Sequence, residues 1–274
     1  MEFPWPIAPS LPDQLEFNAS LYPASPLWNG ALVRYKDRWI QTVRTGWDPF
    51  SSGNYLGELG INLKPLRLFR KISPSDPDAH QEDMRLWTYQ EKLFGSYTFY
   101  TKTKNHDYFG CPIFVDICLI DTRDLVVTRT WQPRIKKQNH WEKNWVFFEY
   151  EGGLYFVYTI APHVVYRYRF GGPAELVGET ETRHNWAVTL RGGTPPIRVG
   201  DRYVSIFHDN TRTRMGWYEF EAKPPFKVIR VGENHIMMKP GHIVFPMGLF
   251  QYQSKFYCTY GEDDCRLKMF RWKH

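Results

Sequence analysis

The sequence lacks long apolar runs, cysteine-rich motifs and a strong excess of one charge. No window approaches the run of about 18 apolar residues that a membrane helix requires, so no membrane span is expected. The four cysteines form two pairs spaced by seven residues, unlike a CxxC or zinc motif, so we expect free buried thiols and no metal. The first residues lack the basic and apolar segments of a secretory signal, which predicts a cytoplasmic protein.

The charge and the aromatic content narrow the class further. There are 35 Lys and Arg against 29 Asp and Glu, a net charge of +6, and the basic residues are dispersed. This distribution argues against a nucleic-acid partner but is compatible with phosphate or a sugar nucleotide. Aromatic residues make up 17% of the chain, which excludes a disordered protein. Tyr, Trp, Phe, Val, Ile and Thr are abundant, which favours an all-β fold.

A unit of strand, tight polar turn and aromatic-rich strand recurs along the chain. Its turns centre on Asp37, Glu91, Gly152, Gly200 and Ser254, at spacings of 54, 61, 48 and 54 residues. The hairpins themselves span 31–45, 84–101, 144–162, 197–209 and 248–264. Such periods are typical of a propeller, so residues 1–274 are predicted to form a single five-bladed β-propeller domain.

A β-sandwich is the alternative, since it also has short strands separated by turns, but it predicts no long period. Four proline-rich stretches, at 4–12, 22–26, 74–77 and 223–225, are interpreted as crossings between blades.

The inner strands of a propeller line a central channel, so polar residues at equivalent places in the repeats are expected to meet there. The candidates at these places, or just before the first strand of a repeat, are Asn18, Arg44, Glu82, Asp83, Arg85, Lys143, Asn144, Arg191, His208, Asp209 and Asp264.

Several of these candidates lie in motifs that occur in the same order as those of a known family. They are FNASLY from residue 17, HQEDMR from 80, EKNW from 142, GGTPPI followed by FHD from 192, IVFPMGLF from 243 and YGEDD from 260. Together they resemble the segments of glycoside hydrolase family 130, the β-mannoside phosphorylases and their relatives. The resemblance implies a five-bladed propeller with inverting chemistry on β-mannosidic linkages and no cofactor besides inorganic phosphate as co-substrate.

The resemblance also implies roles for individual residues. Asp83 matches the general acid, and Lys143 and His208, with help from Arg191, match cations that hold phosphate. A phosphorylase needs a single acid because phosphate is itself the nucleophile, whereas an inverting hydrolase needs a second carboxyl group to activate water. Six further candidates are expected to bind the sugar: Asn18, Arg44, Arg85, Asn144, Asp209 and Asp264.

The same residues also have structural interpretations. Asp83 can be a turn residue that pairs with Arg85, His208 a core histidine, and Asp264 a residue that ties the channel together. Two departures from the family pattern bear on the reaction. Met84 stands in place of a proline, and the stretch that carries phosphate-binding arginines has Lys102 and Lys104 instead.

The sequence therefore predicts an enzyme whose partner is an oligosaccharide, a sugar phosphate or a sugar nucleotide. Phosphorolysis that uses or releases mannose 1-phosphate is the first hypothesis. A β-1,2-mannosyltransferase that uses GDP-mannose, and a β-mannoside hydrolase, are the alternatives within the same class. A propeller that binds glycans without catalysis is the alternative from another class.

Overall fold

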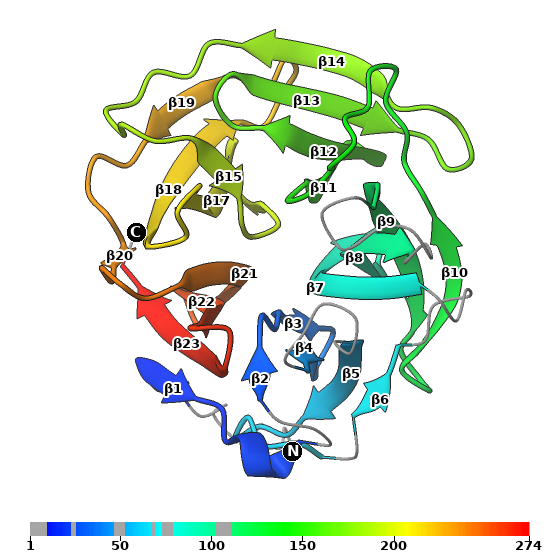
Figure 1. The fold of residues 1–274 in the computed structure, drawn as a ribbon, viewed down its shortest axis with the longest axis vertical. Coiled ribbons are helices and arrows are strands. Elements are labelled where there is room, and N and C mark those ends of the chain that lie inside the picture. The colour runs from blue at the N-terminus through cyan, green and yellow to red at the C-terminus, as the bar shows by residue number, and fades with distance from the viewer. Residues whose placement is uncertain are drawn as a thin grey trace, which may run out of the picture.

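The computed structural model describes residues 10–22, 26–46, 53–66, 69–72, 79–101 and 111–273. These residues form β-strands and one short 3-10 helix, η1 (Ala19–Leu21). The strands make five sheets that are arranged as a ring (Figure 1). The all-β class and the five-bladed propeller expected from the repeats are therefore confirmed.

The sheets follow one another around the ring in chain order. Blade one contains β2 (Leu27–Trp28), β3 (Leu32–Tyr35), β4 (Arg38–Thr45), β5 (Gly53–Leu59) and β6 (Arg70–Lys71). Blade two contains β7 (Ala79–Tyr89), β8 (Lys92–Thr101), β9 (Ile113–Asp121) and β10 (Val126–Trp131). Blade three contains β11 (Val146–Tyr150), β12 (Gly153–Thr159), β13 (His163–Tyr168) and β14 (Glu175–Thr180).

The last two blades complete the ring. Blade four contains β15 (Leu190–Gly192), β16 (Ile197–Val199), β17 (Arg202–Asp209), β18 (Arg214–Glu221), β19 (Val228–Val231) and β20 (Met237–Met238). Blade five contains β21 (Val244–Tyr252), β22 (Lys255–Glu262), β23 (Arg266–Trp272) and β1 (Gln14–Glu16). In blades two, three and five the first of the consecutive strands lies nearest the centre of the ring (Figure 1).

All five predicted hairpins are present, as the antiparallel pairs β3–β4, β7–β8, β11–β12, β16–β17 and β21–β22. Two-residue turns whose residues both have positive φ match the right-handed twist of the strands they join. Gln90 and Glu91 form such a turn, with φ of +47° and +59°, and Gln253 and Ser254 form another, with φ of +48° and +60°.

The two ends of the chain are joined in blade five. The N-terminal strand β1 pairs antiparallel with β23, so that Gln14 lies opposite Phe270 and Glu16 opposite Lys268. The backbone N–H of Arg271 donates to the carbonyl of Asp13 at 2.7 Å and extends this pairing. Because the first strand completes the last blade, these hydrogen bonds hold the ring closed.

The aromatic residues pack between the blades. Trp39 of blade one lies 5.2 Å from Phe250 of blade five, and Trp87 of blade two lies 5.3 Å from Phe147 of blade three. Phe148 of blade three lies 5.4 Å from Phe220 of blade four. Such ring pairs add about 0.5–1.5 kcal/mol each beyond the area that they bury, so the aromatic content stabilises the contacts between neighbouring sheets.

Two further expectations have different outcomes. The four cysteines are free thiols, and three of them are buried, as predicted. The proline-rich stretch at 223–225 is not a crossing between blades, because it connects β18 with β19 in one sheet. The stretch at 74–77 lies outside the described residues.

Candidate active site

Asp83 lies in a β-bulge of β7, the strand of blade two nearest the centre of the ring. Glu82 pairs with Thr98 and Arg85 pairs with Ser96, so the two residues between them face a single residue of β8. Asp83 has a φ of +55°, a left-handed conformation that aspartate adopts more readily than most residues. Bulges redirect side chains next to active sites, and this one turns Asp83 toward blade one.

Blade one and a glycine of β8 hold the bulge in place. The side-chain oxygen of Asn54 accepts from the backbone N–H of Met84 at 3.3 Å, and the Thr42 hydroxyl donates to the Met84 carbonyl at 2.8 Å. The Met84 side chain is buried against Gly95, where a Cβ atom would lie 2.0 Å from the methionine methyl group. The glycine thus leaves room for the methionine side chain at this bulge.

The Asp83 carboxylate is buried and held by two donors of blade one. Asn29 donates to its Oδ1 at 2.8 Å, and Arg44 Nη1 donates to the same oxygen at 3.1 Å. Burial would raise the pKa of this carboxyl group, but the charges of Arg44, Arg85 and Lys143 and the bond from Asn29 together hold the pKa below its usual value. Asp83 is therefore ionised at neutral pH in the free protein.

Glu82 is a second buried carboxylate beside Asp83. Its Oε1 lies 2.8 Å from Arg44 Nη2, and its Oε2 lies 3.3 Å from Lys143 Nζ. The hydroxyl of Tyr100 donates to Oε1 at 3.4 Å. Arg44 thus bridges both carboxylates, and it also stacks on the ring of Trp28 at 4.3 Å. Arg44 is thereby fixed as the cation shared by the two acidic residues.

Arg85 connects blade two with blades three and four. Its Nε donates to the carbonyl of Gly193, and its Nη2 donates to Asn144 Oδ1 at 3.1 Å. Burial lowers the pKa of Arg85 to about 10, against the opposite effect of Asp83. The guanidinium is still charged at neutral pH, so it contributes a buried positive charge next to Asp83.

Lys143 and Asn144 lie just before β11 and reach the site from blade three. Lys143 is the less buried partner of its pair with Glu82, since 28% of its side chain is exposed. Asn144 has a φ of +63°, and its carbonyl oxygen would lie 2.1 Å from a Cβ atom at Gly192. The glycine of the GGTPPI segment therefore allows the chain before β11 to pass close to β15.

His208 is buried, and its surroundings favour a neutral imidazole over the cation that was predicted at this position. Its Nδ1 lies 2.7 Å from the carbonyl oxygen of Asp209, and a carbonyl can only accept, so Nδ1 carries the hydrogen. Burial, with a smaller contribution from the charges of Arg85 and Arg212, lowers the pKa of His208 to about 4. Nε2 is buried without a hydrogen-bond partner among the described residues, so it offers a lone pair, suited to a hydroxyl group.

Asp209 has a structural role, in contrast to the predicted contact with substrate. Its side chain is fully buried and accepts from Thr211 Oγ1 at 2.7 Å, Thr213 N at 3.0 Å and Arg214 Nε at 2.8 Å. Burial would raise its pKa, but these donors hold the pKa below the usual value. The carboxylate shapes the turn between β17 and β18 and leaves no face for a sugar hydroxyl.

Two other predicted residues lie apart from the Asp83 cluster. Asn18 caps η1, since its side-chain oxygen accepts from the backbone N–H of Ser20 at 3.0 Å. Arg191 on β15 pairs in register with His208 but has an exposed side chain. Neither residue forms a hydrogen bond with the cluster within the part of the chain that the structure describes. Lys102 and Lys104 lie outside the described residues.

Asp264 approaches the cluster from blade five. It has a φ of +49° and lies 3.8 Å from Arg212. Burial raises the pKa of Asp264, and the charges of Asp83 and Glu82 add to this effect, while Arg212 and Arg44 oppose it. Asp264 is therefore within electrostatic reach of both buried carboxylates, and it holds a proton more readily than Asp83 does.

Most of the predicted residues thus meet, and others that the prediction gave no role join them. The structure brings together Arg44, Asp83, Arg85, Lys143 and Asn144, with Asp264 nearby. The additional residues are Asn29, Glu82 and Arg212. The sequence shows Glu82 next to Asp83, but residues adjacent in a regular strand face opposite sides, so no local signal predicts that both carboxylates reach Arg44.

Among the described residues, no group of three His, Cys, Asp or Glu side chains is arranged to hold a metal ion. Within the part of the chain that the structure describes, no helix is long and apolar enough to cross a membrane.

The structure resembles solved propellers of carbohydrate-active enzymes. A glycosyl hydrolase from Bacteroides ovatus matches with a TM-score of 0.63 and 13% identity over 92% of this chain and 85% of its own. A structure of the GH130 family of mannoside phosphorylases, which contains glycoside hydrolases that target β-1,2 mannosidic linkages in Candida mannan, matches with a TM-score of 0.61, 13% identity and the same coverage. The expected resemblance in fold to family 130 is therefore confirmed.

Propellers from another group match equally well. The GH43_1 enzyme from Xanthomonas citri complexed with xylotriose has a TM-score of 0.63 and 11% identity, over 96% of this chain and 91% of its own. No protein-family model and no curated protein matches the sequence. At these identities the comparisons show the fold, and the chemistry has to be argued from the site itself.

Proposed function

We propose that this protein is a carbohydrate-active enzyme that acts on β-mannosidic linkages, and that its reaction is phosphorolysis or its reverse. The observation that carries the proposal is the buried Asp83, surrounded by Arg44, Arg85 and Lys143 from three different blades. A binding protein has no need of a buried carboxylate next to three cations. The similarity in fold to mannoside phosphorylases and glycoside hydrolases supports the same class.

The charge state of Asp83 favours the synthetic direction. In that direction an acceptor hydroxyl attacks the anomeric carbon of mannose 1-phosphate, the bond from this carbon to the phosphate oxygen breaks, and Asp83 takes the hydroxyl proton. A general base must be ionised before the reaction, and Asp83 is ionised because three cations lower its pKa. Lys143 is the most exposed of these cations, so we assign it to the departing phosphate.

Glu82 favours hydrolysis as the second candidate. An inverting hydrolase requires two carboxyl groups, one to protonate the leaving oxygen and one to activate water. Glu82 and Asp83 provide two buried carboxylates that share Arg44. A reaction with water would also leave the pairing between Glu82 and Lys143 intact, whereas binding of phosphate at Lys143 competes with it.

The proposal is tested by comparing the products that the protein forms in the presence and in the absence of phosphate. The protein is incubated with β-1,2-mannobiose in the presence and absence of phosphate, and with mannose 1-phosphate or GDP-mannose together with mannosyl acceptors. Phosphate-dependent formation of α-mannose 1-phosphate, or chain growth from it, supports phosphorolysis. Release of mannose without phosphate supports hydrolysis, and growth from GDP-mannose alone supports the transferase.

Variants at two aspartates provide the control. Asp83→Asn should lower turnover about 10³-fold, within the range for loss of a general acid or base. Asp37→Asn changes a carboxyl group whose side chain is 97% exposed in the turn between β3 and β4, and it should leave turnover unchanged. Absence of turnover with every donor in the unaltered protein would contradict the enzymatic proposal and favour a glycan-binding propeller.

A further inference from the structure

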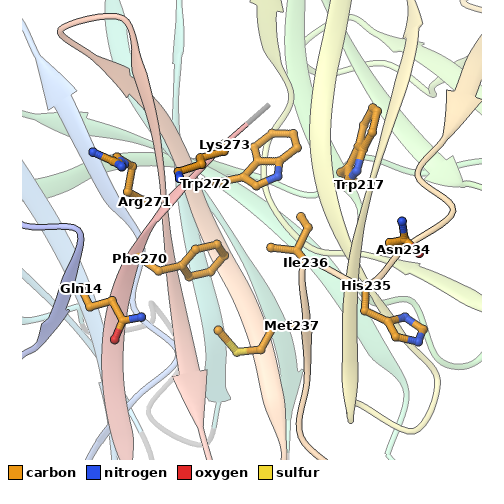
Figure 2. Close-up of a pocket in the computed structure, with 10 residues that line it drawn as sticks. All are labelled: Gln14, Trp217, Asn234, His235, Ile236, Met237, Phe270, Arg271, Trp272 and Lys273. Carbon is orange, nitrogen blue, oxygen red and sulfur yellow. The ribbon is translucent and has the colours of Figure 1, made fainter.

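A second site candidate lies between blades four and five, away from the Asp83 cluster. It is a hollow of about 430 Å³ lined by Trp217 of β18, Met237 of β20, and Phe270 and Trp272 of β23 (Figure 2). This volume is in the range of about 300–1,000 Å³ that is typical of small-molecule sites. None of the residues that line it belongs to the candidate active site.

The aromatic wall is rigid. The ring of Trp217 lies 5.7 Å from that of Trp272 at an angle of 50°, and the guanidinium of Arg230 covers Trp217 at 4.6 Å. Gly232 packs against the same ring, since a Cβ atom there would lie 2.3 Å from Trp217 Nε1. A ring that is already fixed loses little conformational entropy when a ligand binds to it.

Polar groups surround this apolar wall, and Lys273 adds one amine at its edge (Figure 2). The exposed amides of Gln14 and Asn234, on opposite sides of the hollow, each offer donors and an acceptor, and the exposed imidazole of His235 lies next to Asn234 (Figure 2). No acidic residue occurs among the described residues that line the hollow. Arg271 is already paired with Asp13 at 2.8 Å. Apolar rings next to neutral hydrogen-bonding groups match a pyranose sugar, which has an apolar C–H face and a rim of hydroxyl groups.

The geometry of the rings favours a sugar over a nucleotide base. A planar base inserted between two rings requires a separation of about 7 Å, twice the contact distance of about 3.5 Å. Trp217 and Trp272 are closer than this and tilted, so they form a wall and not a slot.

The hollow continues into a second one, which suits a chain of sugars. The neighbouring hollow, of about 300 Å³, shares Gln14, Met237 and Phe270 with the first. Its two lysines, Lys239 and Lys268, are both paired with the buried Glu262. The two hollows together form a groove. Its acidic residue among the described lining residues, Glu16, is paired with Lys268 at 3.3 Å.

We propose that this groove is a non-catalytic binding site for a neutral oligosaccharide chain. The site would hold a glycan on the outside of the ring while the enzyme acts at another place. The proposal goes beyond the reaction assigned to Asp83 and does not depend on it, because binding here involves none of the residues of the candidate active site.

The proposal is tested by measuring how the Asp83→Asn protein binds manno-oligosaccharides and xylo-oligosaccharides. Calorimetry measures the affinity, and gels containing mannan or xylan show binding as retardation of the protein. The double variant Gln14→Ala/Asn234→Ala should weaken binding about 10-fold through two lost hydrogen bonds. Trp217→Phe keeps a ring in place and should weaken binding less. Asn62→Ala alters an exposed amide in blade one and is the matched control, with unchanged binding.

Activity on a short soluble substrate should be equal in the double variant and the unaltered protein, which separates this site from the active site. Equal affinity of the double variant and the unaltered protein for the glycan would overturn the proposal. Absence of binding to every neutral chain, or displacement of the glycan by an anionic polymer such as heparin, would overturn it as well.

Discussion

Replacing Glu82 by glutamine removes one of the two negative charges that share Arg44 and keeps the shape of the side chain. The change removes the ion pair between Glu82 and Lys143 at 3.3 Å and leaves Arg44 with Asp83 at 3.1 Å. The variant therefore tests whether Lys143 binds phosphate more tightly once its carboxylate partner is removed. It also tests whether Glu82 itself takes part in the reaction.

The contacts set the size of both expected effects. Loss of one member of a buried ion pair costs about 3–5 kcal/mol. Glutamine retains an acceptor for Arg44, and Arg44 retains Asp83, so we expect the free energy of unfolding to fall by about 1–3 kcal/mol. The partly exposed pair with Lys143 is worth about 1 kcal/mol, so its loss should tighten phosphate binding about fivefold.

Urea denaturation measures the first effect, and calorimetry with inorganic phosphate measures the second. Glu58→Gln is the matched control, because it breaks another pair with an arginine, Arg38 at 2.6 Å, and should leave phosphate binding unchanged. Phosphate binding that is unchanged or weaker in Glu82→Gln would refute the competition for Lys143. A loss of phosphate-independent hydrolysis by 100-fold or more would instead identify Glu82 as the base of a hydrolase.

Three further predictions concern stability and reactivity. Burial lowers the pKa of both His163 and His208 to about 4 from 6.5, so the unfolded chain takes up protons first as the pH falls. The free energy of unfolding should therefore be highest above about pH 6.5 and fall toward pH 4, by up to about 3 kcal/mol per imidazole, in denaturation curves at a series of pH values. Cys265 should react with a thiol reagent in the folded protein, whereas the three buried thiols should react only after unfolding; equal rates for all four would contradict this. Gly192→Ala should push the chain at Asn144 outward, destabilise the protein by about 1–3 kcal/mol and lower turnover at least 10-fold, as shown by combined denaturation and rate measurements.

The fold was predictable because its signal is local and repeated. Each hairpin shows the alternation of apolar and polar residues that places one face of a strand in the core, and five copies of one unit specify a ring. The pairing of β1 with β23 was not predictable, because the three residues of β1 form too short a pattern to be recognised as a strand.

The sequence predicted most of the residues that meet at the candidate site. It predicted their protonation states and hydrogen-bonding roles much less well. The position of His208 gave no sign that burial and the neighbouring Arg85 keep its ring neutral. In the case of Asp209 a signal was present, because aspartate followed by threonine two residues later is typical of a turn that the side chain caps. That local pattern favours the structural role that the hydrogen bonds show.

The charges around Asp83 indicate how the choice between phosphate and water would depend on pH. Four cations, Arg44, Arg85, Lys143 and Arg212, face three carboxyl groups, Glu82, Asp83 and Asp264, which gives a local charge of +1. Additional positive charge at this place would favour the binding of a phosphate anion. Burial and the neighbouring carboxylates raise the pKa of Asp264, so as the pH falls Asp264 gains a proton before Asp83 does, and the local charge becomes more positive. Phosphate binding to the unaltered protein should therefore become tighter as the pH falls. The Asp264→Asn variant should lose this pH dependence. In a hydrolase, proton uptake by Asp264 would not be coupled to phosphate binding.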